Sequence, residues 1–221
     1  IWKGLVGSEM CIRDRSDDAF PLYRMRHTHI GHAPVFAQRL SFTGETGWEI
    51  FVTPDFAEHV LEIILKAGQP LGLRLAGGEA LNALRIEKGF QHWGADMAYT
   101  EAPYQLGLDF ICKPDKTLPF IGRDACLARK AGPKGPCLRS VKLADPDAIL
   151  HHNEPVLRDG QIIGFVTSGA FCAMQKAAVG LCLVSPPDGA GGFEAVDDGP
   201  CSVMVEGREV PAELRRKPFG A

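Results

Sequence analysis

Residues 39–50 read RLSFTGETGWEI and predict a β-hairpin. Before the turn, apolar and polar residues roughly alternate over 34–42, which is typical of a half-buried strand. Two glycines within residues 43–47 allow the left-handed backbone that a tight reversal requires. A second strand is expected over 48–52. The hairpin therefore presents one carboxylate, Glu49, just beyond its turn.

Glu49 has two interpretations. On the second strand it faces away from Trp48 and Ile50, because successive side chains of a strand point to opposite faces. A carboxylate near aromatic rings can accept paired hydrogen bonds from a flat heterocycle, such as the amino-pyrimidinone edge of a pterin. The alternative is an ordinary hairpin with a solvated glutamate. The stretch alone favours this alternative, because most exposed glutamates have no specific partner.

Beyond the hairpin, the chain predicts two helices and a linker. Pro54 begins a helix whose apolar residues recur at helical spacing until Gly68 ends it. A second helix is expected at about 79–88, closed by Gly89. Residues 131–136, AGPKGP, are the best linker, because glycine and proline fill four of the six positions. A strand hairpin followed by two helices is an α+β pattern.

From Cys137 onward the pattern is all-β. Residues 155–166 read PVLRDGQIIGFV and predict a hairpin around Asp159-Gly160, the strongest short turn signal. Further strands are expected at 138–143 and 178–184, and a closing hairpin is expected with strands 201–205 and 209–214 around Glu206-Gly207. Several short strands at regular spacing predict a small barrel. The predicted fold class is therefore α+β, with a small all-β barrel domain at the C-terminal end.

Four further motifs follow the hairpin in a fixed order: ALNALRIEKGF (80–90), WGADM (93–97), PYQLGL (103–108) and FIGR (120–123). The whole series resembles the folate-binding aminomethyltransferase family, whose best-known member is the T-protein of the glycine cleavage system. It is most similar to relatives fused at the C-terminal end of flavin-dependent dimethylglycine and sarcosine dehydrogenases, which often carry LRIEKG followed by Trp-Gly. The resemblance implies the C-terminal portion of a folate-binding domain, followed by the family's barrel.

The resemblance also implies a chemistry and its site residues. In that family, tetrahydrofolate captures a one-carbon unit, released as an iminium or formaldehyde equivalent, and becomes methylenetetrahydrofolate. Glu49 matches the glutamate that binds the folate pterin, and Phe42 occupies a position often held by tyrosine. Trp48, Tyr104 and Phe110 complete the folate-binding residues that we expect. FAD would be bound only by a separate domain that is absent from this chain.

Three positions depart from the T-protein pattern. Leu81 stands where the T-protein carries a folate-contacting arginine, Phe110 stands where it has a tryptophan, and Gln105 replaces a common glutamate. Leu81 in particular favours the dehydrogenase-fused branch. The predicted function is tetrahydrofolate-dependent one-carbon transfer within an N-methylglycine-type oxidative demethylase. A free-standing aminomethyltransferase and a non-catalytic folate-binding module of the same fold are the alternatives.

The N-terminal stretch 1–15, IWKGLVGSEMCIRDR, shows no strand or helix period and is interpreted as an artefact or an unstructured segment. The expected domains are then 16–130, a partial folate-binding domain, and 137–219, the barrel. On this interpretation the chain is an N-terminally truncated fragment, and the first half of the folate domain would precede Ser16. That half would carry the family's key aspartate. No catalytic residue is therefore assigned here, and the chain alone is expected to be inactive.

Composition bears on partners and compartment. A net charge of −3 without a basic run argues against nucleic acid and anionic membrane surfaces, and no run is apolar enough for a membrane span. The expected partners are a folate, a one-carbon unit from an N-methyl amine, and a flavin dehydrogenase domain in the parent chain. Seven scattered cysteines without a C-x-x-C pair fit a reducing cytoplasm. His27, His29 and His32 form H-x-H-x-x-H, but nothing nearby completes a ligand set, so no metal site is predicted.

Overall fold

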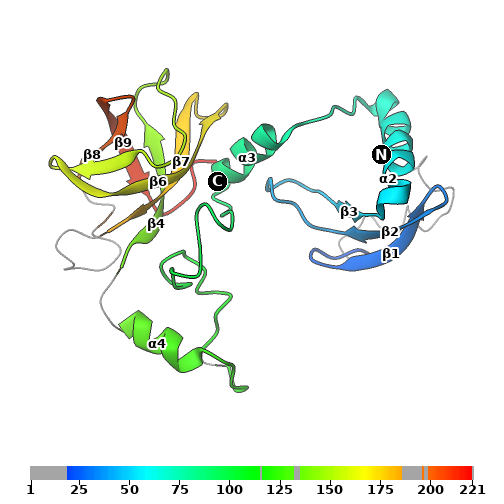
Figure 1. Ribbon diagram of the computed structural model, residues 1–221, viewed down its shortest axis with the longest axis horizontal. Helices are drawn as coiled ribbons and strands as arrows, with labels where there is room; N and C mark the ends of the chain where they lie inside the picture. Colours follow the sequence, from blue (N-terminus) through cyan, green and yellow to red (C-terminus); the bar gives the residue numbers. More distant parts are fainter. Residues whose placement is uncertain (1–18, 115, 132–134, 186–195, 197–198, 221) are drawn as a thin grey trace. The chain divides into compact units, whose positions relative to one another are not determined.

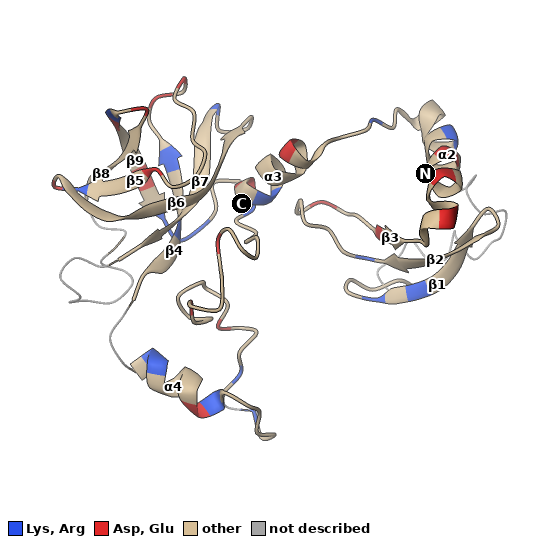
Figure 2. Ribbon diagram, viewed as in Figure 1, with Lys and Arg blue, Asp and Glu red and all other residues tan. Residues whose placement is uncertain are grey.

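The computed structural model describes residues 19–114, 116–131, 135–185, 196 and 199–220. The chain divides into two compact units, 1–78 and 79–221, and each unit is described by itself. Within each unit, acidic and basic residues are interspersed along the ribbon (Figure 2). Among the described residues, no helix combines the length and the apolar character that crossing a membrane requires.

Unit 1 is a three-stranded antiparallel sheet with one long helix packed on it (Figure 1). The sheet order is β1-β2-β3, so that β3 is an edge strand. Its elements are β1 (Met25–Ile30), β2 (Ala33–Gln38), β3 (Glu49–Phe51), α2 (Pro54–Gly68) and the short 3₁₀ helix η2 (Gln69–Leu71). The core lies between sheet and helix: Ile30, Ala33, Val35 and Val60 are buried, with Ile50, Val52, Phe56, Ile63 and Ile64 packed against them.

The helix α2 confirms the expectation from sequence. Pro54 occupies its first turn, where the missing backbone N–H costs no hydrogen bond, and the helix runs to Gly68. Its apolar side chains form one stripe that packs on the sheet, as the helical spacing predicted.

The hairpin differs in detail from the prediction. β2 ends at Gln38 instead of continuing to residue 42, and β3 begins at Glu49 instead of 48. In the connection, the Ser41 hydroxyl accepts a hydrogen bond from the Thr43 backbone N–H at 3.2 Å and lies 3.0 Å from the Thr43 hydroxyl. Such local hydrogen bonds compete with strand pairing, and they explain why the turn is wider than predicted.

Strand β1 was missed by the sequence analysis. It pairs with β2 through a tight turn at Gly31, whose φ of +60° suits glycine. Its outward positions include His27 and His29, which lie opposite Phe36 and Pro34 on β2. The sequence did not indicate this strand, because its solvent-facing side chains are polar and only Ile30 of β1 is fully buried.

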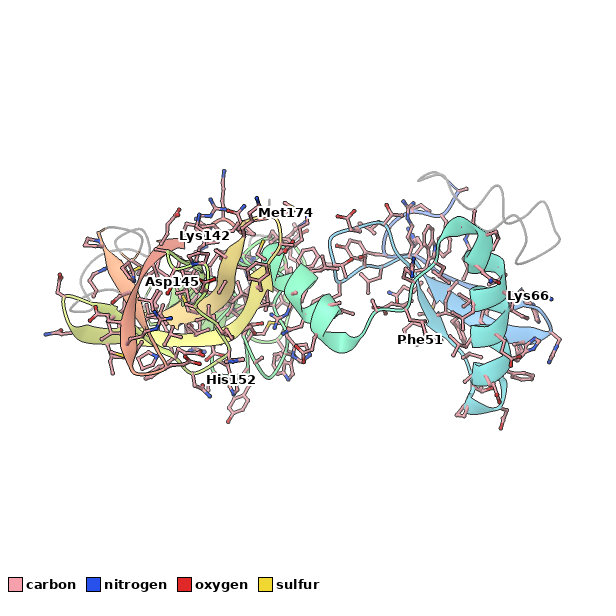
Figure 3. All side chains as sticks on the ribbon, turned by 90° about the horizontal axis from the view of Figure 1, so that it is seen from above. Phe51, Lys66, Lys142, Asp145, His152 and Met174 are labelled. Carbon is pink, nitrogen blue, oxygen red and sulfur yellow. The ribbon has the colours of Figure 1, made fainter. Side chains whose placement is uncertain are left out.

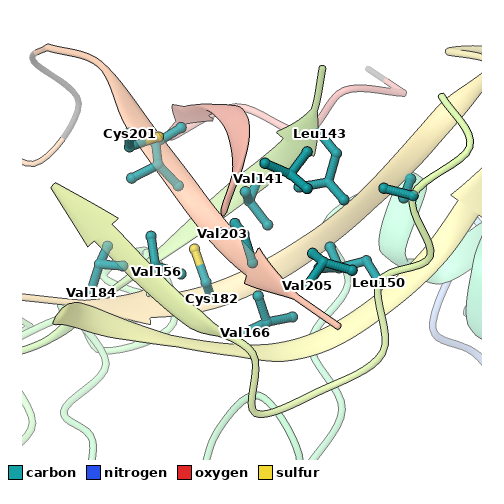
Figure 4. Close-up of a cluster of buried hydrophobic side chains, with 14 of the residues drawn as sticks. Val141, Leu143, Leu150, Val156, Val166, Cys182, Val184, Cys201, Val203 and Val205 are labelled. Carbon is teal, nitrogen blue, oxygen red and sulfur yellow. The ribbon is translucent and has the colours of Figure 1, made fainter. Parts of the chain in front are cut away.

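Unit 2 contains helix α3 (Gly78–Glu87), helix α4 (Arg123–Ala131) and a closed antiparallel barrel in the order β4-β7-β6-β5-β8-β9. The barrel strands are β4 (Cys137–Leu143), β5 (Pro155–Arg158), β6 (Gln161–Cys172), β7 (Ala177–Val184), β8 (Cys201–Val205) and β9 (Arg208–Arg215). Its interior is filled mainly by valines, among them Val141, Val156, Val166, Val184 and Val203 (Figure 4). The predicted α+β fold with a small all-β barrel is confirmed.

The barrel hairpins follow the predicted turn chemistry. Asp159 and Gly160 have φ of +51° and +73°, and Glu206 and Gly207 have φ of +49° and +77°. Positive φ at both central residues is the type I′ geometry, whose twist matches the strands it joins. The Asp-Gly hairpin expected within residues 155–166 is therefore confirmed.

The C-terminal segment binds helix α3 to the barrel. The backbone N–H of Gly220 donates to the Glu87 carbonyl at 2.8 Å, and the Lys88 ammonium donates to the Gly220 carbonyl at 3.1 Å. Ile86 and Phe219 are buried together with residues of β6 and β7. Helix α3 is therefore part of the barrel unit.

Candidate functional site

Glu49 is the first residue of β3 and lies opposite Gln38 of β2. Its side chain is exposed, and within the described part of the chain its carboxylate makes no hydrogen bond or ion pair. A charged oxygen pair on an edge strand, without a structural partner, is available to accept hydrogen bonds from a ligand.

The face of the sheet that carries Glu49 is also aromatic. Phe51 shares this face with Glu49, and across the sheet it lies opposite Phe36 of β2 (Figure 3 labels Phe51). Phe36 and Phe51 are 40% and 47% exposed, so that both rings are accessible to a ligand. The ring of His27 on β1 packs on Phe36, with ring centroids 3.8 Å apart. A flat ring placed here would contact aromatic side chains with its face and Glu49 with its edge.

Phe36 and Phe51 were not among the predicted site residues. The signal was present in the period-two alternation, since Phe36 and Phe51 occupy the same side of their strands as Gln38 and Glu49. The sequence analysis assigned these aromatics no role, because the register between β2 and β3 depends on the length of the connection.

Phe42 and Trp48 lie in the connection between β2 and β3, and both are half-buried. The Arg39 guanidinium lies 5.7 Å from the centroid of the Trp48 ring and donates to the Phe20 carbonyl at 2.7 Å. This cation–π contact holds the side chain of Trp48, the residue directly before Glu49. Phe42, Trp48 and Glu49, three of the five predicted folate-binding residues, thus all belong to unit 1, and their assignment to a folate site stays a prediction.

Tyr104 and Phe110 belong to unit 2. The Tyr104 side chain is buried, and its hydroxyl donates to the Arg129 carbonyl of α4 at 2.8 Å. Tyr104 also lines a hollow of about 490 Å³, whose wall includes Lys130 and Arg139. Phe110 is 70% exposed. Their assignment to a folate site stays a prediction.

Arg85, on helix α3, is at the centre of a buried polar network that the sequence analysis missed. The residue is only 3% exposed, and its guanidinium forms an ion pair with Asp96. It also donates to Asn82 Oδ1 at 2.9 Å, to the Phe90 carbonyl at 3.1 Å and to the Ser168 hydroxyl at 2.6 Å. A buried guanidinium with this many acceptors is a structural cation.

Asp96 completes the network from the other side. It is fully buried and accepts from the Thr167 hydroxyl at 2.5 Å and from the His92 backbone N–H at 2.9 Å, in addition to Arg85. Thr167 lies on β6. The motifs LRIEKG and WGADM, which carried much of the family resemblance, therefore meet in space and hold α3 and the following loop on the barrel.

Gln105 is likewise structural. It is 5% exposed, its Oε1 accepts from the Ala102 backbone N–H at 2.8 Å, and its Nε2 donates to the Pro136 carbonyl at 2.7 Å. A glutamate could make the first of these bonds but not the second, because an ionised carboxylate only accepts. The glutamine that replaces the family's glutamate therefore supplies the donor that the Pro136 carbonyl of this chain accepts from.

Among the residues that the structure describes, no three His, Cys, Asp or Glu side chains are grouped so that they could hold a metal ion. His32 instead stacks on His59 of α2, with ring centroids 3.8 Å apart.

Two family models match the chain. The model described as the GCVT N-terminal domain matches residues 6–116, and the model described as the glycine cleavage T-protein C-terminal barrel domain matches residues 137–220. The chain belongs to the glycine cleavage T-protein family. The resemblance inferred from its motifs is thereby confirmed. The first match begins inside the stretch 1–15 that the sequence analysis set aside; this stretch lies outside the described residues, so its exclusion stays a prediction.

Three curated relatives are similar to the chain. A 4-methylaminobutanoate oxidase (formaldehyde-forming) from Paenarthrobacter nicotinovorans is 39% identical over 96% of the chain and 25% of its own length. Human mitochondrial dimethylglycine dehydrogenase is 35% identical over 78% of the chain and 20% of its own length. An aminomethyltransferase from Porphyromonas gingivalis is 32% identical over 86% of the chain and 51% of its own length. The chain therefore spans about a fifth to a half of these relatives.

A solved structure supports the fold of this T-protein family member. The glycine cleavage system aminomethyltransferase T from Bartonella henselae superposes with a TM-score of 0.73 over 90% of the chain and 53% of that protein, at 22% identity.

Proposed function

We propose that the chain takes part in tetrahydrofolate-dependent one-carbon transfer, as the folate-binding part of an oxidative demethylase for an N-methyl amine of the N-methylglycine type. The observation that carries the proposal is the exposed, unpartnered carboxylate of Glu49 beside aromatic side chains, in a chain of the T-protein family. Similarity to an oxidase named as formaldehyde-forming supports the demethylase branch, since formaldehyde is a one-carbon unit.

The residues of unit 1 fit a folate in two respects. Glu49 would accept the donors of the amino-pyrimidinone edge, and charged acceptors form the stronger hydrogen bonds. Phe51 and Phe36 would contact the face of the heterocycle, because they share the sheet face of Glu49. Tetrahydrofolate, when bound, supplies the nucleophilic amine that captures the one-carbon unit. The chain's own residues would bind and orient it.

Glu45 provides a matched control for the test of Glu49, because it is an exposed glutamate in the connection before β3. In the full-length parent protein, Glu49→Gln should weaken tetrahydrofolate binding, measured by calorimetry, whereas Glu45→Gln should not. Equal affinities of both variants and the wild type would refute the role of Glu49. The present chain alone should bind tetrahydrofolate weakly or not at all, so micromolar binding by it would contradict the proposed need for a further part of the site.

A second candidate is a free-standing aminomethyltransferase, which the similarity to the Porphyromonas gingivalis protein over half of its length supports. The genomic reading frame around the chain distinguishes the two. A flavin- and dinucleotide-binding domain upstream would support the demethylase, and FAD would then belong to that domain. A folate domain beginning with its own Met would support the aminomethyltransferase, and folate binding without turnover would indicate a non-catalytic module.

We also propose a cytoplasmic location. It is supported by the six cysteines of the described residues, which are all free thiols, as a reducing compartment maintains them. Fractionation of cells that produce the parent protein tests this, and a mitochondrial signal, as the name of the human relative suggests for that protein, would contradict it.

A further inference from the structure

Two cysteines of unit 2, far from the barrel interior, lie in direct contact. The sulfur of Cys112, in the loop after Ile111, is 3.4 Å from the sulfur of Cys126 on α4. Both thiols are free and partly accessible to solvent, whereas the other described cysteines, Cys137, Cys172, Cys182 and Cys201, are buried. The pair is thus distinguished by both proximity and access.

The contact is held from both ends of α4. At its beginning, the Arg123 guanidinium donates to the Pro114 carbonyl at 2.6 Å. Near its end, the Lys130 ammonium forms an ion pair with Asp109 at 3.1 Å. In sequence, Asp109 and Pro114 lie on either side of Cys112. Arg123 and Lys130 likewise lie on either side of Cys126. The two contacts therefore flank the cysteines in both segments. The loop and the helix are therefore kept in the register that places the two sulfurs together.

We propose that Cys112 and Cys126 form a redox-active dithiol, which closes to an intrachain disulfide by exchange with a low-molecular-weight disulfide of the glutathione type. The sulfurs need to approach by about 1.4 Å to reach the ~2.05 Å length of a disulfide bond. No such closure is available to a cysteine buried alone in the barrel wall.

The exchange is balanced in two steps. One protein thiol loses its proton and attacks a sulfur of the small disulfide, which forms a mixed disulfide and releases one small thiolate that takes up a proton. The second protein thiol then loses its proton and attacks the protein sulfur of the mixed disulfide, which releases the second small thiol. Two protein thiols are oxidised and one small disulfide is reduced to two thiols.

The electrostatics set the pH range of the first step. The hydrogen bond with Cys112, followed by burial, raises the pKa of the Cys126 thiol. Since only the thiolate attacks, exchange started by Cys126 should accelerate as the pH rises above neutrality. The reverse reaction, with a small dithiol as reductant, should reopen the bond.

Closure would join the loop that carries Phe110 covalently to α4. In the reduced form, the contacts between the described part of this loop and α4 include the hydrogen bond of Arg123 and one half-exposed ion pair. The disulfide would therefore restrict an exposed segment of unit 2 without touching the barrel core, and it is inferred without the role proposed for Glu49.

The test equilibrates the full chain in mixtures of glutathione and glutathione disulfide, traps free thiols with iodoacetamide, and digests with trypsin. The expected product is one linked pair, residues 89–116 joined to 124–129, because trypsin does not cleave between Lys113 and Pro114. Each closed molecule takes up two fewer alkyl groups, and dithiothreitol restores them. Cys11→Ser should leave the linked pair unchanged, whereas Cys112→Ser or Cys126→Ser should abolish it and leave a glutathione adduct on the remaining cysteine.

Two results would overturn the proposal. One is the absence of the linked pair even when glutathione disulfide is in large excess while both cysteines are alkylated freely. The other is a linked pair that joins Cys11 or a barrel cysteine to Cys112 or Cys126 in preference. A second measurement needs no oxidant. Phenylarsine oxide bridges two close thiols, so it should protect Cys112 and Cys126 of the wild type from alkylation. Failure to protect them would contradict the proximity on which the proposal rests.

Discussion

Replacing Asp96 by asparagine should be among the most damaging conservative changes in this chain. The ion pair of Arg85 and Asp96 is withdrawn from water, since the two side chains are 3% and 0% exposed. Asparagine keeps the shape of the side chain but removes the charge that compensates the guanidinium. The remaining acceptors of Arg85, on Asn82, Phe90 and Ser168, are neutral oxygens. Breaking a buried pair from one side costs about 3–5 kcal/mol.

Hydrogen exchange read by mass spectrometry is the suitable assay, because peptides from β6 and β7 report on unit 2 separately from unit 1. When reclosing is fast compared with chemical exchange, the rate of the slowest amides follows the free energy of unfolding. A loss of 3–5 kcal/mol corresponds to exchange about 100- to 5,000-fold faster in these strands. Asp109→Asn is the matched control. Its ion pair with Lys130 is about half exposed, so its removal should cost about 0–1 kcal/mol.

The double variant Arg85→Met with Asp96→Asn separates charge from shape. If the penalty of each single variant comes from the unpaired charge, the double variant should cost clearly less than the sum of the two single variants. The reasoning is refuted if Asp96→Asn changes exchange in β6 no more than Asp109→Asn does. Strict additivity of the two single variants would also refute it.

Three further predictions concern single side chains. Glu49→Gln should weaken folate binding by the parent protein by about 1.5–3 kcal/mol, yet shift the free energy of unfolding by less than ~0.5 kcal/mol, because the carboxylate has no structural partner; calorimetry and denaturation of one variant measure both. Gln105→Glu should destabilise unit 2 by about 1–3 kcal/mol in denaturation at neutral pH, because the Pro136 carbonyl loses its donor, and acidification that protonates the new carboxyl should recover part of the loss. Burial and the hydrogen bond with Glu87 raise the pKa of Cys172. Its stabilising contribution is therefore full below the ordinary thiol pKa and is lost at alkaline pH, so that thermal unfolding of Cys172→Ala should depend less on pH there than that of the wild type.

Much of the fold was predictable because its signals are local. Pro54 and Gly68 mark the two ends of α2, and the Asp159-Gly160 turn requires a backbone geometry that few residue pairs adopt so readily. Helix α4 was missed for the opposite reason. It is short, none of its residues is buried, and it depends on contacts such as the one between Arg123 and the Pro114 carbonyl.

The interior contacts of unit 2 could not be predicted from local pattern. Arg85 looks like a surface residue of an amphipathic helix until β6 supplies Ser168, which lies 83 positions away along the chain. Helical spacing places a side chain on one face of its own helix, but it does not say what covers that face. The contact between Cys112 and Cys126 is nonlocal in the same way, since it depends on where α4 lies against a loop without regular structure.

The residues that reveal the family and those that would bind its ligand are therefore different. Arg85 and Asp96 come from the two most recognisable motifs, and their contacts hold α3 on the barrel. Both side chains are buried, so they are inaccessible to any ligand unless the network opens. Glu49 is exposed and has no hydrogen-bond or ion-pair partner among the described residues, but an exposed glutamate in a hairpin is unremarkable by sequence alone. A protein could keep the ion pair of Arg85 and Asp96, and with it the fold, while losing the carboxylate of Glu49 and the ability to bind folate. Because stability and ligand binding depend on separate residues, hydrogen exchange on Asp96→Asn and calorimetry on Glu49→Gln should give opposite patterns: the first lowers stability, and the second lowers only affinity.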